Sequence, residues 1–166
     1  QQDNQNFGVI LIDDASGSDH NWCYPMLLGS LAPRTTLIRH TQHHGRMPNF
    51  LLAINEICVN PTAFVAVLDQ DDCLMRADIA DSLLLAREEG ADLVHMPMFR
   101  PNKPLKLYPP NYQQPRQMAG GNVWSHHRVF SKALFERVPE RYFRRIGTEE
   151  WFDIVTDYLT MLPMSE

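Results

Sequence analysis

Short apolar runs alternate along this chain with longer segments in which apolar residues recur every three or four positions. The apolar runs at residues 7–12, 35–39 and 64–68 predict strands, and a further strand is expected at residues 91–99. The helical spacing predicts helices at residues 21–31, 49–59, 77–89, 131–138 and 148–161. Strands that alternate with helices indicate an α/β sandwich with a largely parallel sheet.

Two of the expected helices begin with a capping signal. Ser131 is the predicted N-cap of one, and Thr148 is the predicted N-cap of the other. Glu149 and Glu150 would then lie in the first turn, where the helix dipole favours carboxylates. On the helical pattern alone, these two glutamates are a dipole-compensating pair.

Carboxylates follow two of the predicted strands at the point where each strand ends. Asp13 and Asp14 come directly after the first strand, and Asp69, Asp71 and Asp72 follow the third. In an open α/β sheet, ligands bind in the crevice outside the carboxyl ends of the strands, so both groups are candidate binding residues. Such close carboxylates repel unless a cation offsets their charge, and oxygen ligands favour Mg²⁺ or Mn²⁺ over zinc. The alternative for the second group is a solvated turn with one aspartate as a helix cap.

Composition and charge narrow the class of protein. With 15 Lys and Arg against 20 Asp and Glu, the formal net charge of −5 argues against nonspecific nucleic-acid binding. The three cysteines form no CxxC pair, which suits a reducing compartment. No apolar run approaches the roughly 18 residues that span a bilayer. We therefore expect a cytoplasmic chain, and any attachment to a membrane would be through parts of the protein outside this chain. A length of 166 residues predicts one domain.

The seven histidines raise the question of a zinc site. The densest group is His40, His43 and His44, but neither an HExxH motif nor a cysteine pair accompanies it. We therefore interpret this stretch as a polar loop.

Residues 12–19, with the sequence IDDASGSD, are similar to the early Asp-Asp-(Gly/Ala)-Ser-x-Asp segment of the family 2 glycosyltransferases. Further stretches match the same family in the same order: HHGRMPN at 43–49, LDQDD at 68–72, residues 121–135, and GTEEWFD at 147–153. The chain thus resembles this family of inverting, nucleotide-sugar-dependent enzymes over residues 7–158.

The resemblance implies the GT-A fold, a three-layer α/β/α sandwich with a mostly parallel sheet, formed by residues 1–166 as a single domain. Members of the family open with a strand that helps to hold the nucleotide. Here nothing precedes the strand that matches the family's second one, so we expect the domain to be incomplete at its N-terminus. The resemblance also implies a nucleoside-diphosphate sugar as donor, a saccharide or a lipid-linked acceptor, and a role in polysaccharide or glycoconjugate synthesis.

Roles for individual residues follow from the same resemblance. Asp71 would bind a Mn²⁺ or Mg²⁺ ion that bridges the donor's phosphates, and Asp69 would contact the ribose or the metal shell. Either Asp13 or Asp14 would hold the base. Glu150, which stands where the family has an aspartate, would be the general base that deprotonates the acceptor.

The acceptor side of the expected site is less clearly marked. Glu149, Trp124 and His126 lie in the segments that match the acceptor side of the family. For Trp124, packing in the core is an equally good interpretation, because a large aromatic ring serves either purpose.

Two other functions account for parts of the pattern. Residues 67–71 resemble the strand motif of haloacid-dehalogenase phosphohydrolases, with Asp69 as nucleophile and Asp71 as general acid, although Asp72 and Cys73 stand where that motif has small and hydroxylated residues. The other alternative is a non-catalytic nucleotide-sugar-binding module of the same fold, since a fold does not by itself establish an activity.

Overall fold

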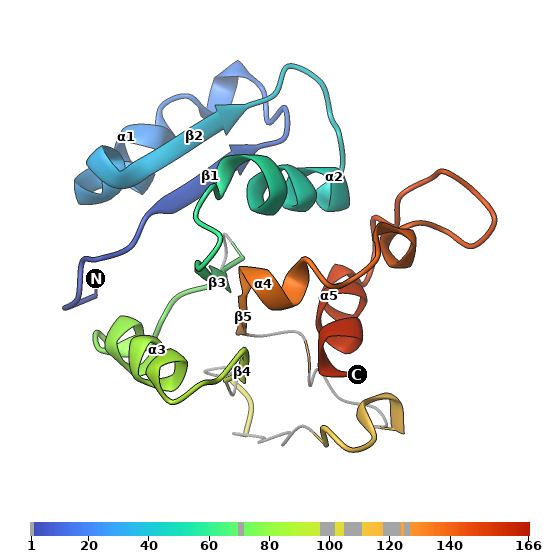
Figure 1. The fold of residues 1–166 in the computed structure, drawn as a ribbon. Helices are drawn as coiled ribbons and strands as arrows, with labels where there is room; N and C mark the ends of the chain where they lie inside the picture. Colours follow the sequence, from blue (N-terminus) through green and yellow to red (C-terminus); the bar gives the residue numbers. More distant parts are fainter. Residues whose placement is uncertain (1, 70–71, 97–101, 105–110, 118–123, 125–126) are drawn as a thin grey trace.

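A computed structural model describes residues 2–69, 72–96, 102–104, 111–117, 124 and 127–166 (Figure 1). The strands are β1 (Val9–Asp13), β2 (Thr35–Arg39), β3 (Phe64–Val67), β4 (Leu93–His95) and β5 (Arg128–Ser131). The α-helices are α1 (Cys23–Leu28), α2 (Arg46–Leu51), α3 (Ile79–Glu88), α4 (Lys132–Phe135) and α5 (Thr156–Ser165). Shorter helical turns are η1 (Ser18–His20), η2 (Gly29–Arg34), η4 (Pro115–Gln117) and η5 (Glu140–Phe143), and η3 (Leu52–Ile57) is a π-helix that continues α2.

The described strands form two sheets. β1 and β2 pair in parallel, so that Asp13 at the end of β1 lies opposite Arg39. β3, β5 and β4 form a second sheet in that order, and β5 runs antiparallel to both neighbours. The expectation of a mostly parallel sheet is therefore wrong for the described residues. β3 and β4, which α3 connects, do run in the same direction, but β5 has come between them.

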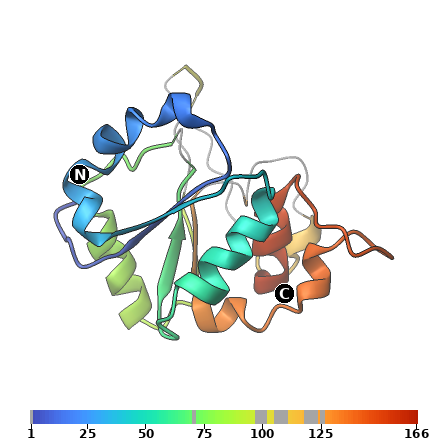
Figure 2. The ribbon, with the colours of Figure 1, turned by 90° about the horizontal axis from the view of Figure 1, so that it is seen from above.

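Helices cover both sides of the second sheet. Seen from above, α3 lies on one side of β3, and α2, α4 and α5 lie on the other (Figure 2). The helix expected at residues 77–89 is confirmed as α3, and the cap at Ser131 is confirmed because its Oγ accepts a hydrogen bond from the Leu134 N–H at 3.1 Å. Within the described ranges, no helix has both the length and the apolar character needed to cross a membrane.

The helix expected at residues 148–161 begins much later, at Thr156, so Glu149 and Glu150 do not lie in its first turn. The chain before α5 instead folds back on itself. Arg144 and Trp151 form a β-bridge, and the Arg145 N–H donates to the Glu150 carbonyl at 2.8 Å. The Arg144 guanidinium also lies 3.7 Å from the Trp151 ring centroid. These contacts use the backbone groups that a helix from Thr148 would need.

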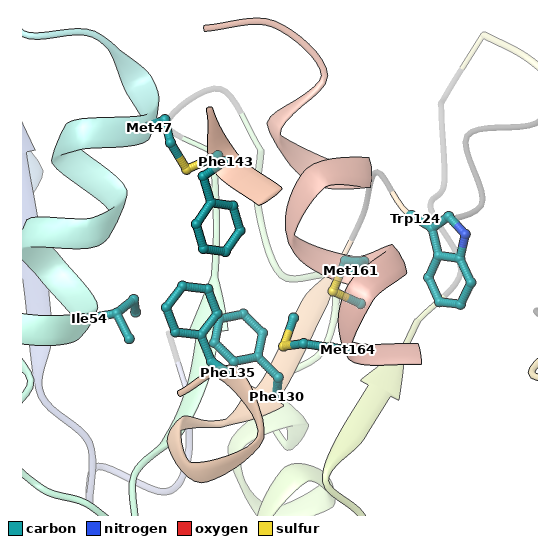
Figure 3. Close-up of a cluster of buried hydrophobic side chains, with 8 residues drawn as sticks. All are labelled: Met47, Ile54, Trp124, Phe130, Phe135, Phe143, Met161 and Met164. Carbon is teal, nitrogen blue, oxygen red and sulfur yellow. The ribbon is translucent and has the colours of Figure 1, made fainter. Parts of the chain in front are cut away.

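The hydrophobic core lies against the second sheet (Figure 3). Its aromatic centre is Phe130, Phe135 and Phe143, with successive ring centroids 5.6 Å apart. The other buried hydrophobic members are Met47, Ile54, Trp124, Met161 and Met164. No described residue before Met47 belongs to this core cluster of buried residues, so the β1–β2 sheet lies at its margin.

Candidate functional site

The last residue of β1, Asp13, is buried and held by three groups of the protein. Its Oδ1 accepts a hydrogen bond from the Ser16 N–H at 2.9 Å, and its Oδ2 accepts from the Tyr24 hydroxyl and from Arg39 Nε at 3.4 Å. Hydrogen bonds from Ser16, from Tyr24 and from Arg39 outweigh burial and hold the pKa of Asp13 well below its usual range. Asp13 therefore ties β1 to α1 and β2 as a permanent carboxylate.

Asp14 points instead to the start of α2. Its Oδ1 accepts from the His44 N–H at 2.8 Å and its Oδ2 from the Gly45 N–H at 2.9 Å, while His43 Nδ1 lies 2.8 Å from Oδ2. Burial raises the pKa of Asp14, but the hydrogen bonds from His44, Asn49 and Gly45, with the charge of His43, bring it below its usual value. The side chain remains 21% exposed, against 6% for Asp13.

The loop that contains His40, His43 and His44 lies next to Asp14. His43 is beside Asp14, and the rings of His40 and His44 are 4.4 Å apart. In the part of the chain that the structure describes, no three histidine, cysteine, aspartate or glutamate side chains are grouped as metal ligands. The observed contacts of the loop with Asp14 are the hydrogen bonds from the His44 and Gly45 N–H groups and the ion pair with His43.

At the end of β3, Asp69 is paired with a buried arginine that the sequence did not single out. Arg128, on β5 and 4% exposed, donates from Nη2 to Asp69 Oδ1 at 2.8 Å. Its Nη1 lies 2.6 Å from Oδ1 of Asp157, in the first turn of α5. The sequence signal for Arg128 is faint: it is a single cation at the start of the apolar stretch that forms β5.

The expected metal ligand, Asp71, lies outside the described residues, as does His126. Of the described neighbours, Asp69 has a carboxylate that is 29% exposed, and its Oδ2 accepts no hydrogen bond within the described ranges. Mg²⁺ and Mn²⁺ sites commonly use one or two carboxylates together with substrate phosphates and water. The donor chemistry on this strand end therefore fits such an ion.

Glu149 and Glu150 belong to the segment between η5 and α5. This segment forms a loop that projects from the rest of the chain (Figure 1). The Glu149 side chain is 95% exposed and lies 3.3 Å from Arg144, and the Glu150 side chain is 72% exposed and lies 3.7 Å from Arg145. Both carboxylates are exposed to solvent, and each lies beside an arginine.

Asp153, three residues after Glu150, lies beside Gly45, the residue that precedes α2. Its Oδ1 approaches Gly45 so closely that a Cβ at that glycine would be 2.5 Å away. Gly45 has φ +93°, and its N–H is bonded to Asp14. A glycine is required here both for the backbone conformation and for the space that Asp153 occupies.

Trp124, the other expected acceptor residue, is fully buried in the core. Its ring packs edge-on against His95 and Tyr112, with centroids 6.2 Å and 5.9 Å away. The structure thus places this side chain among protein groups, as the core-packing alternative expects.

A comparison with models of protein families matches residues 1–150 to the model described as glycosyl transferase family 2. Searches of curated proteins and of solved structures found no match to the chain.

Proposed function

The chain belongs to glycosyl transferase family 2, and from this premise we propose that it moves a sugar from a nucleoside-diphosphate sugar to an acceptor hydroxyl with inversion at the anomeric carbon. The observation that carries the proposal is the family match over residues 1–150, which includes both strand ends that carry carboxylates. Membership implies a glycosyltransferase with the GT-A fold. Residues 1–166 are proposed to act as one domain in polysaccharide or glycoconjugate synthesis.

On the donor side, Asp14 is proposed to contact the base. Its carboxylate is more exposed than that of Asp13, 21% against 6%, and an ionised carboxylate can accept more hydrogen bonds than the protein supplies here. Asp13 is proposed to have a structural role, because its hydrogen bond from the Ser16 N–H fixes the turn after β1. Asp69 is proposed to accept a ribose hydroxyl with its Oδ2.

Asp71 is the proposed ligand of Mn²⁺ or Mg²⁺, with Asp69 at the edge of the same shell. When bound, such an ion supplies positive charge that stabilises the negative charge developing on the departing diphosphate. The aspartates of this strand end keep that charge next to the nucleotide.

On the acceptor side, Glu150 is the proposed general base. Its carboxylate takes the proton of the acceptor hydroxyl as the oxygen attacks the anomeric carbon, and the bond to the nucleoside diphosphate breaks on the opposite face. The exposure of Glu150 and of its neighbour Glu149 supports access of a saccharide or lipid-linked hydroxyl to this loop.

A thermal-shift panel tests the donor side. UDP, GDP, dTDP and CDP are each added with and without Mn²⁺, and one nucleotide at 100 times its Kd should raise Tm by roughly 5–10 °C only when metal is present. Asp71→Asn should abolish the metal-dependent shift, whereas Asp81→Asn on α3 should retain it.

Other outcomes of the panel would contradict the proposal. No shift with any nucleotide, together with phosphatase activity in Mg²⁺, would favour the haloacid-dehalogenase alternative. A nucleotide shift without transfer to any saccharide acceptor would indicate a binding module.

A further inference from the structure

Arg128 is a buried cation that joins two separate parts of the proposed site. One nitrogen of its guanidinium holds Asp69 at the end of β3, and the other holds Asp157 at the start of α5. The contact with Asp69, at 2.8 Å, is a charge-assisted hydrogen bond, and the contact with Asp157, at 2.6 Å, is an ion pair.

The register of the sheet explains how Arg128 reaches Asp69. Arg128 lies opposite Val67 in the β3–β5 pair, and Asp69 follows Val67 by two positions. Side chains two positions apart on a strand share a face, and a long side chain reaches a diagonal neighbour across the strands. Packing of α5 against this face then brings Asp157 to the other nitrogen.

The charges in this group are unequally exposed. The Arg128 side chain is 4% exposed, whereas Asp69 and Asp157 are 29% and 20% exposed. Burying an unpaired cation is costly in free energy. Losing the pairing would therefore cost the buried guanidinium more than it would cost the two carboxylates, which are partly solvated.

The bond to Arg128 uses only one oxygen of Asp69. Oδ1 is held, and Oδ2 has no hydrogen-bond partner among the described residues. A carboxylate fixed through one oxygen keeps the other in a constant position and loses less rotamer freedom when a ligand binds.

We propose that Arg128 is the positioning residue of the donor site: anchored on Asp157, it fixes the Asp69 carboxylate for the nucleotide without touching the nucleotide itself. This inference rests on the proposed function, because it takes Asp69 to be a donor contact. It predicts that donor affinity depends on the fork geometry of the guanidinium as well as on its charge. Lysine, a point charge on a flexible stem, cannot hold two carboxylates in the same way.

The test compares Arg128→Lys and Arg128→Met with the parent by isothermal titration of the nucleotide selected by the panel, with Mn²⁺, well below each Tm. Both variants should bind about 10- to 100-fold more weakly, as expected for loss of a group that orients a ligand contact. Asp157→Asn, which leaves Arg128 with a single carboxylate anchor, should also weaken binding, by several-fold.

The matched control is Lys132→Met. Lys132 is a second buried cation, 6% exposed, that bonds the Cys58 carbonyl and lies 3.6 Å from Glu136. Its loss should lower Tm while nucleotide affinity stays at the parent value. This comparison separates a positioning role from a purely stabilising one.

Two results would overturn the inference. In the first, the Arg128→Lys and Asp157→Asn variants both bind the nucleotide as tightly as the parent. In the second, the Lys132→Met variant loses as much nucleotide affinity as the Arg128 variants. If Arg128→Met does not fold, the other two variants still decide the matter. A parent protein that binds no nucleotide would refute the proposed function itself, whereas a parent that binds with unaffected variants would refute only the role of Arg128.

Discussion

Asp13 and Asp14 are adjacent in the sequence but have different surroundings. Successive side chains of an extended chain point to opposite sides, so Asp13 turns toward Tyr24 and Arg39 while Asp14 turns toward the backbone of His44 and Gly45. One carboxylate is thereby used to build the turn, and its neighbour stays partly open to a ligand.

Asp13→Asn should destabilise the protein at pH 7 by about 2 kcal/mol, because an amide replaces a charged acceptor of three hydrogen bonds. The folded-state pKa of Asp13 is depressed, so its contribution to stability is present above the usual aspartate pKa of about 4 and is lost as the pH falls below it. Urea unfolding of parent and variant between pH 3 and 7 should show the difference shrinking on acidification. A constant difference would contradict this role, and Asp19→Asn, on exposed η1, is the control.

At the scale of elements, the loop between η5 and α5 carries Glu149 and Glu150, the residues proposed for the acceptor side. It is closed at its base by the Arg144–Trp151 bridge and the stacking of the same two side chains. Ile146, at 98% exposure, and Glu149 project from it. The loop is thus fixed where it leaves the fold and open where an acceptor would approach.

Glu150→Gln should leave nucleotide binding unchanged and reduce transfer by at least about 100-fold, because the amide cannot accept the acceptor's proton. The measurement pairs nucleotide titration with release of nucleoside diphosphate in the presence of saccharide acceptors. Glu88→Gln, an exposed carboxylate on α3, is the control and should change the rate little. Transfer by Glu150→Gln at the parent's rate would show that another group, with Asp153 beside Gly45 the nearest alternative, is the base.

Over the whole molecule, burial is uneven. The eight buried residues of the core cluster come from Met47 onward, and in the described ranges no hydrophobic residue of β1 or β2 is fully buried. Because burial of apolar surface is the main source of stability, the sheet that carries Asp13 and Asp14 is held less firmly than the sheet that carries Asp69 and Arg128.

Hydrogen exchange should reveal this difference. Amides of β5 should exchange at the rate of global unfolding, and amides of β1 and β2 should exchange at least roughly tenfold faster, which corresponds to an opening cheaper by about 1.4 kcal/mol. Peptides followed by mass spectrometry would resolve the two sheets. Equal protection in β1 and β5 would contradict this picture.

Local patterns in the sequence determined much of this protein. The strand at residues 35–39, helix α3, the Ser131 cap and the carboxylates at the ends of β1 and β3 follow from side-chain spacing and capping chemistry, which act within a few residues. The motif order identified the family, and the family model confirms it.

The tertiary structure decided what depends on distant partners. It placed β5 between β3 and β4, put Trp124 in the core, folded the segment before α5 into a loop, and brought Arg128 to Asp69 across 59 positions of sequence. The physical reason is that sheet order and buried charge pairing depend on which faces pack together. Which faces pack together depends on the apolar surface and the charges that the whole chain buries, so no short stretch of sequence determines it.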